Sequence, residues 1–116
     1  MKSILIIKDQ KIISLDIKTT LKDAGYTVDS ALDGVEGIEK IKQKKTYDLI
    51  ILNNSMPRMT GKEFYIKVLA LSEDLANEVM FVTGRVTEFI KSTGNPFLIK
   101  PFSPEQLMEE VKRLTD

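Results

Sequence analysis

Four polar residues end or follow short apolar runs of the sequence, and each carries a side chain that can do chemistry. They are Asp9, Asn53, Thr83 and Lys100. Asp9 can supply a hard oxygen ligand, and Thr83 supplies a hydroxyl next to a glycine that allows close backbone approach. Lys100 supplies an ammonium, and Asn53 supplies an uncharged amide. Each residue taken alone is more often plain turn chemistry, but their joint occurrence favours a functional site.

The periodicity of the sequence predicts alternating strands and helices. Runs that are apolar at successive positions suit strands buried on both faces of a parallel sheet. They occur at Ile4–Ile7, Leu49–Leu52, Val79–Val82 and Phe97–Ile99. A weaker, alternating pattern at Tyr26–Ser30 predicts an outer strand.

Apolar stripes with helical spacing lie between these runs. The stripes are Ile13, Ile17, Leu21 and Ala24; Val35, Ile38 and Ile41; Phe64, Val68, Leu71 and Leu75; and Leu107, Val111 and Leu114. Gly25 is placed to stop the first of these helices. Ser103 as N-cap, Pro104 at the first position and Gln106 in a capping box open the last one. Thr87–Thr93 has room only for a short helix.

Five successive strand–helix units predict a single α/β domain over residues 1–116, with a parallel sheet and right-handed crossovers. Helices on both faces of five strands favour the flavodoxin-like order 2-1-3-4-5, a three-layer sandwich. Chemistry in this architecture lies at the carboxyl ends of the strands. The fold would therefore gather Asp9, Asn53, Thr83 and Lys100 on one rim.

The composition excludes several classes of function. Seventeen basic and seventeen acidic residues give a formal net charge of zero, with no field that favours nucleic acid or anionic lipid. The absence of Cys and His excludes disulfides, thiolate sites, imidazole catalysis and His-ligated metal. The apolar run near the N-terminus is too short for a signal peptide or a membrane span. These features predict a cytoplasmic protein that binds neither nucleic acid nor membrane.

The whole chain resembles the receiver domain of two-component response regulators. The resemblance rests on "ILIIKDQ", "DLIILNNSMPRMTG", "FVTG" and "NPFLIKPFSPEQL". The last of these segments looks most like receivers attached to hybrid histidine kinases. The pair Met56-Pro57 followed by Gly61, combined with the Lys100-Pro101-Phe102 corner, makes the resemblance specific.

The resemblance implies roles for individual residues. In receivers, an Asp at the end of the third strand accepts a phosphoryl group from a phosphohistidine, and two acidic residues after the first strand help it to hold Mg²⁺. Counting back from Met56-Pro57 places Asn53 at the acceptor position. Lys8 stands at the first position of the acidic pair, so Asp9 is the remaining anionic candidate of a degenerate metal corner that also includes Ser55. The remaining equivalents are the switch hydroxyl Thr83, the switch aromatic Phe97 and the phosphate-contacting Lys100.

These departures predict a degenerate receiver that is not an enzyme and acts through protein–protein contacts. An amide oxygen lacks the charge and nucleophilicity of a carboxylate. Mg²⁺ prefers carboxylates, and two unit charges ~4 Å apart at an effective dielectric of roughly 20 interact by ~4 kcal/mol. Lys8 therefore makes Mg²⁺ binding weak or absent, and no cofactor is expected. We expect Lys8 and Lys100 to point towards Asp9 as internal cations, with an ammonium also satisfying the carbonyl of Asn53.

Two alternatives remain at this point. One is a receiver phosphorylated at an atypical hydroxyl, Ser55 or Thr83. The other is a flavodoxin-like domain that binds FMN or a nucleotide, although the segment after the first strand is not a Gly/Ser/Thr-rich phosphate loop. The resemblance implies a signalling partner such as a histidine kinase or an output domain. It leaves open a homodimer through the helix at 87–93, the strand at 97–99 and the last helix.

Overall fold

The computed structural model describes residues 2–7, 11–44, 46–53 and 59–115, with residues 11–16 and 44 described by their backbone only. The elements in chain order are β1 (Ser3–Ile7), α1 (Lys11–Asp23), β2 (Thr27–Ala31), α2 (Gly34–Lys44), β3 (Leu49–Asn53), α3 (Gly61–Leu71), α4 (Glu73–Ala76), β4 (Val79–Thr83), α5 (Glu88–Thr93), β5 (Phe97–Ile99) and α6 (Pro104–Thr115). None of the helices in these residues is long and apolar enough to cross a membrane.

The five strands form one sheet in the order β2-β1-β3-β4-β5, and every neighbouring pair is parallel. The flavodoxin-like order predicted from the sequence is therefore confirmed. The three central strands β1, β3 and β4 are buried along almost their whole length. This burial explains why they are apolar at successive positions instead of alternate ones.

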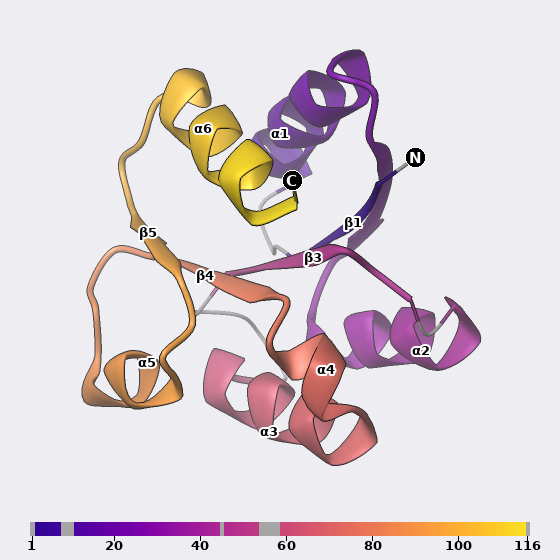
Figure 1. Cartoon of the computed structure of the whole chain (residues 1–116), viewed down its shortest axis with the longest axis vertical. Helices are drawn as coiled ribbons and strands as arrows, with labels where there is room; N and C mark the ends of the chain where they lie inside the picture. The colour runs from indigo at the N-terminus through magenta and orange to yellow at the C-terminus, as the bar shows by residue number, and fades with distance from the viewer. Residues whose placement is uncertain (1, 8–10, 45, 54–58, 116) are drawn as a thin grey trace.

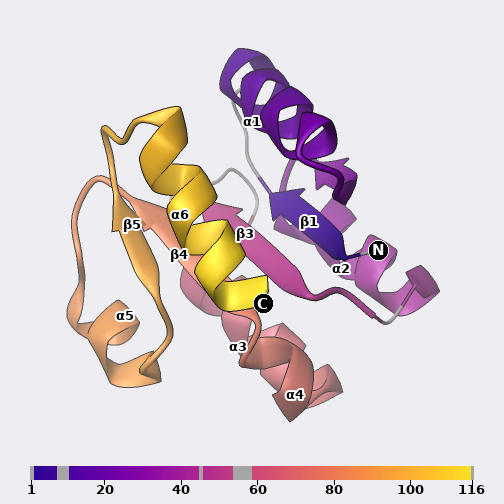
Figure 2. The same ribbon diagram turned by 45° about the horizontal axis from the view of Figure 1, so that its top comes forward.

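The helices cover the two faces of the sheet in separate layers (Figure 1). α2, α3, α4 and α5 pack on one face around the largest buried side chains, Phe64 and Phe81. α1 and α6 pack on the other face, where Ile17 and Leu21 of α1 share a core with Leu107 and Val111 of α6. Figure 2 shows these two helices coming forward on the same side of the sheet. The arrangement is the three-layer sandwich that the strand–helix alternation predicts.

Several helix ends follow the chemistry of the sequence. In the capping box of α6, the Ser103 backbone N–H donates to Gln106 Oε1 at 2.8 Å and the Gln106 N–H donates to Ser103 Oγ at 3.1 Å, as predicted. Gly25, in the turn that ends α1, has a φ of 99°, a backbone conformation that favours glycine. The short helix predicted at Thr87–Thr93 is α5, which begins with Thr87 as N-cap and ends at Gly94.

The prediction of a single helix from the third apolar stripe, which runs from Phe64 to Leu75, was wrong. Ser72 has an extended backbone, with φ −166° and ψ 116°, so it ends α3 and begins α4. Its backbone N–H donates to Val68 O, and its side-chain oxygen accepts from Leu75 N at 3.1 Å. A serine oxygen that caps the next turn competes with continuation of the helix. Leu71, expected in the core, is consequently 49% exposed.

Two smaller expectations on the α1–β2 connection need correction. Ala24 is exposed and lies outside α1, so it does not belong to the buried stripe. The outer strand begins at Thr27, one residue later than predicted, because the Tyr26 backbone N–H still bonds to Leu21 O in the helix-ending turn. The Tyr26 hydroxyl lies 3.1 Å from Thr115 Oγ1 at the end of α6.

Candidate functional site

Three of the predicted site residues meet at the carboxyl edge of the sheet. Asn53 is the last residue of β3, Thr83 is the last residue of β4, and Lys100 directly follows β5. The backbone N–H of Lys100 donates to Thr83 O at 2.8 Å, which extends the pairing of β4 and β5 by one residue. The Lys100–Pro101 peptide bond is cis. The parallel sheet thus brings together residues that lie up to 47 positions apart.

A direct side-chain contact joins Lys100 to Asn53. The Lys100 ammonium donates to Asn53 Oδ1 at 3.0 Å, and Asn53 is only 3% exposed. The amide oxygen is neutral, so the contact is a charge-assisted hydrogen bond and not an ion pair. An amide held in this way can accept a hydrogen bond and position an ammonium, but it offers no anionic oxygen as a nucleophile.

The hydroxyl of Thr83 is engaged by the loop that follows β4. Thr83 Oγ1 donates to Arg85 O at 2.7 Å and accepts from the Arg85 backbone N–H at 3.1 Å. Thr83 is 5% exposed. A hydroxyl has one proton to donate, and here that proton is committed to the loop. Release of the hydroxyl towards a ligand on the rim would require the backbone at Arg85 to find other partners.

Phe97 lies on the edge of the sheet and is 41% exposed. It pairs with Phe81 in the register of β4 and β5. The next residue, Leu98, packs against the core on the opposite face of the sheet, under α6. Side chains alternate along a strand, so Phe97 and Ile99 share the face of the sheet that carries α5. Both side chains remain substantially exposed there.

The other predicted residues of the corner, Lys8, Asp9 and Ser55, lie outside the described residues. The expected contact between an ammonium and Asp9 therefore stays a prediction. The second expected contact, between an ammonium and the Asn53 side-chain carbonyl, is present and is made by Lys100. Within the part of the chain that the structure describes, no group of three or more acidic, His or Cys side chains is placed to hold a metal ion.

A buried polar cluster at the opposite edge of the sheet, where β4 and β5 begin, was missed by the sequence analysis. The Asn95 side-chain amide donates to Ala76 O at 2.8 Å and to Val79 O at 2.9 Å, and its oxygen accepts from the Tyr65 hydroxyl at 3.2 Å. Asn95 lies between Gly94 and Pro96, so its surroundings in the sequence indicate an ordinary turn. The cluster ties the start of β5 to α3 and to the connection from α4 to β4.

Comparison with known proteins agrees with this architecture. A family model described as the response regulator receiver domain matches residues 4–112. The chain is 28% identical to the chemotaxis protein CheY of Thermotoga maritima over 118 residues, covering 98% of each protein. It is 29% identical to the transcriptional regulatory protein DltR of Streptococcus agalactiae, covering 97% of this chain and 51% of that protein. The chain thus spans about half the length of DltR.

Solved structures give the same result. The structure of the chemotaxis protein CheY4 from Vibrio cholerae superposes with a TM-score of 0.87 at 32% identity, covering 98% of each chain. The match extends over the helices on both faces as well as the sheet. The chain belongs to the response regulator receiver domain family.

Proposed function

We propose that this chain is a receiver-like signalling module that is not phosphorylated at the acceptor position and acts through protein–protein contacts. The observation that carries the proposal is the hydrogen bond from the Lys100 ammonium to the buried amide of Asn53. The cation that receivers use to contact a phosphoryl group is held here by the residue that stands in place of the acceptor.

The chemistry of the amide supports this proposal. Formation of an acyl phosphate needs a carboxylate oxygen to attack phosphorus, and the amide of Asn53 has no negative charge to provide. Among the described residues that end strands, Thr83 carries a hydroxyl oxygen that could act as a nucleophile. Its proton is donated to the backbone carbonyl of Arg85 instead of to a base, so its hydroxyl is not activated.

The donor set does not fit Mg²⁺ well. The oxygen of Asn53 is neutral and already accepts from an ammonium, whereas Mg²⁺ favours carboxylates in near-ideal octahedral geometry. Lys8 in place of an acidic residue adds a positive charge to the sequence of this corner. No step of the proposed function passes through a metal ion.

The partner in this proposal is a signalling protein such as a histidine kinase or an output domain. The relative DltR is a transcriptional regulatory protein about twice as long as this chain, which supports an output domain as one kind of partner. The exposed side chains of Phe97 and Ile99 beside α5 offer apolar contact area. Aromatic residues are enriched at the cores of protein interfaces.

Phosphoryl uptake provides the test. The protein is incubated with Mg²⁺ and either acetyl phosphate or a phosphorylated histidine kinase, and its intact mass is measured. We expect no stable gain of one phosphoryl mass. A gain that maps to the loop from Asn53 to Ser55, or to Thr83, would overturn the proposal and establish phosphorylation at that residue. Loss of the gain in a Ser55→Ala or Thr83→Ala variant would identify the atypical acceptor.

A further inference from the structure

The segment 84–94, which contains α5, keeps its hydrogen bonds to itself. In the part of the chain that the structure describes, its residues bond to one another or to the flanking Thr83 and Asn95. Gly84 and Gly94 lie at the two ends of the segment, and a Cβ added at either one would meet nothing within 4 Å. The backbone of α5 is therefore not paired with the rest of the fold, and side chains hold this helix in place.

Aromatic rings anchor the start of α5. The ring of Phe89 in α5 meets Tyr65 of α3 and Phe81 of β4 edge-on, with centroids 5.8 and 5.9 Å apart. Tyr65 and Phe81 also contact each other, at 5.7 Å. The Lys62 ammonium lies 5.7 Å from the centroid of the Phe89 ring, within the range of a cation–π interaction. Edge-to-face pairs stabilise beyond the area that they bury, so this cluster ties α5 to α3.

The hydroxyl of the same tyrosine holds the other end of the segment. Tyr65 donates to Asn95 Oδ1 at 3.2 Å, and the Asn95 backbone N–H donates to Thr93 Oγ1, on the last residue of α5, at 3.1 Å. Tyr65 and Asn95 are both buried. One side chain of α3 thus holds α5 twice, through its ring near the start of the helix and through its hydroxyl directly after the end.

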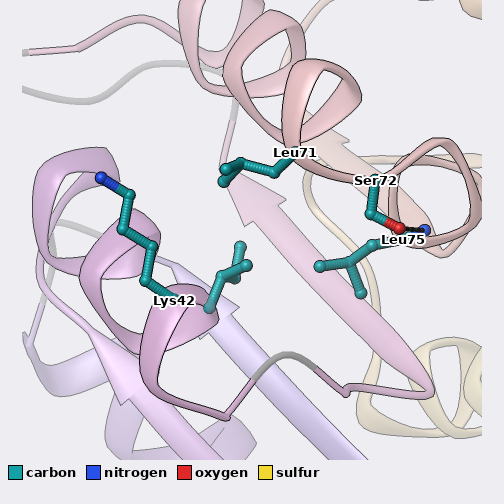
Figure 3. A pocket seen from close by; sticks show the side chains of 5 residues that line it. Lys42, Leu71, Ser72 and Leu75 are labelled. Atoms are coloured by element: carbon teal, nitrogen blue, oxygen red, sulfur yellow. Dashed lines mark hydrogen bonds between the residues drawn. The ribbon is translucent and has the colours of Figure 1, made fainter.

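The side of α3 that faces α2 is not filled in this way. A groove of about 350 Å³ lies there, lined by Ile41, Lys42, Leu71, Ser72 and Leu75. Figure 3 shows the Leu71 side chain extending from the end of α3 beside this groove. Leu71 is 49% exposed, whereas Tyr65 is 8% exposed. Substitutions on these two sides of one helix therefore separate the contact with α5 from a general effect on α3.

We propose that Tyr65 is a positioning residue that keeps α5 closed on the sheet and so fixes the α5–β5 surface, formed by α5 with the exposed side chains of Phe97 and Ile99. These side chains share the face of the sheet that carries α5, so the position of α5 decides how that surface is shaped. The inference rests on the proposed function in that this surface would meet the partner. Control comes from α3 and not from the strand-end site, whose hydrogen bonds to the segment stop at Arg85, before α5 begins.

The first experiment measures local opening of α5 by native-state hydrogen exchange. The amides of Lys91 and Gly94, bonded within the segment, should exchange faster than that of Ile50, which bonds to Glu78 O at the central strand β3. Tyr65→Phe keeps the ring and deletes the hydroxyl. It should raise the exchange rates of Lys91 and Gly94 at least fivefold, because the deleted hydrogen bond opposes the opening. Unchanged rates at these two amides would overturn the proposal even if Ile50 exchanged faster, since the hydroxyl would then serve global stability alone.

Three further variants serve as comparisons. Tyr26→Phe deletes a hydroxyl that lies 3.1 Å from Thr115 Oγ1, on the other face of the sheet. Leu71→Ala changes the groove side of α3. Both should leave the exchange rates of α5 unaltered. Thr83→Ala removes the side-chain hydrogen bonds to Arg85 and should raise these rates less than Tyr65→Phe. A larger effect of Thr83→Ala would assign the position of α5 to the strand-end site and overturn the proposal.

The second experiment asks whether opening of α5 reaches β5. Methyl relaxation dispersion detects motion on the microsecond–millisecond scale. In Tyr65→Phe we expect dispersion at Ile90, which is fully buried under α5, and at Ile99, and we expect neither in Tyr26→Phe. Dispersion at Ile90 alone, or at neither residue, would overturn the proposal. Both experiments omit any phosphoryl donor, so their failure leaves the test of phosphoryl uptake unaffected, and uptake of a phosphoryl group would leave their result standing.

Discussion

The ammonium of Lys100 and the amide oxygen of Asn53 are 3.0 Å apart and belong to the ends of two strands that are separated by a third. The contact spans β4, so it ties the edge of the sheet to its centre. Because Asn53 is buried and neutral, this contact gives the ammonium a hydrogen-bond acceptor without a negative charge. This relationship leads to the first two predictions.

Removal of the Lys100 ammonium should destabilise the domain modestly. Lys100→Met keeps most of the apolar stem and deletes the donor to Asn53, which should lower the free energy of unfolding by roughly 1 kcal/mol. Lys91→Met is the control, because the Lys91 side chain is 63% exposed and its ammonium lies 4.0 Å from Glu88 Oε1. This variant should change the free energy of unfolding by less than about 0.5 kcal/mol. Urea denaturation measures both. Equal effects would show that the contact with Asn53 contributes nothing.

Restoring two acidic residues should restore the missing chemistry. We expect the double substitution Lys8→Asp with Asn53→Asp to bind Mg²⁺ and to take up a phosphoryl group from acetyl phosphate, because it supplies the nucleophile and removes the opposing charge. Titration with Mg²⁺ should move the amide resonances of Asp9 and the residue at position 53 in this variant and leave them nearly unmoved in the unmodified protein. If the variant gains neither property, residues at other positions must also contribute to the absence of Mg²⁺ binding and phosphoryl uptake.

The Asn95 cluster should contribute more to stability than the rim contact. Asn95→Ala deletes the donors to Ala76 O and Val79 O and leaves the Tyr65 hydroxyl without this acceptor. Unsatisfied buried groups cost about 1–3 kcal/mol each, so we expect a loss of roughly 2–4 kcal/mol. Asn77→Ala, an exposed asparagine at the end of α4, should cost less than about 0.5 kcal/mol. Thermal unfolding followed by circular dichroism compares the two variants.

Glu78 should make stability depend on pH. Burial, with the nearby carboxylates of Asp48 and Asp74, raises the pKa of Glu78 above its usual range. The folded protein therefore binds this proton more tightly than the unfolded chain, and stability falls as the pH rises through the titration of Glu78. Glu78→Gln should raise the melting temperature at pH 7 by an amount equivalent to no more than about 0.5 kcal/mol.

This gain should vanish well below the usual carboxyl range, at about pH 3, where Glu78 is protonated in both the folded and the unfolded states. Glu109→Gln, on the exposed side of α6, serves as the control for loss of one negative charge. A gain that persists unchanged at low pH would assign the effect to packing of the amide and not to titration of Glu78.

The strand order and the two-layer distribution of helices could be predicted because they depend on periodicity. Buried strands such as β1 and β3 are apolar at successive positions, which makes them recognisable in the sequence. The start of α6 could be predicted from its capping residues. The break at Ser72 could not be predicted in this way. A serine within an apolar stripe is compatible with a helix until its side chain is seen to cap the next turn.

The sequence predicted that Asn53, Thr83 and Lys100 lie on one rim of the sheet, because each residue ends or follows a strand. The contact of Lys100 with Asn53 matches the expectation of an ammonium on that carbonyl. The Asn95 cluster was missed because its partners are the carbonyls of Ala76 and Val79 and the hydroxyl of Tyr65. Every residue has a backbone carbonyl, so the sequence does not indicate which carbonyls accept hydrogen bonds from a side chain. The hydrogen bonds of the Thr83 hydroxyl with the Arg85 backbone could not be predicted for the same reason.

The shortness of β5 has a consequence for solubility. A strand at the edge of a sheet presents unpaired backbone groups that can template pairing with another chain. β5 has three residues, and the chain continues through Pro101, which has no backbone N–H to offer. The half-exposed side chains of Phe97 and Ile99 therefore sit on an edge too short to add a foreign strand. The domain can keep an apolar contact surface there without seeding aggregates.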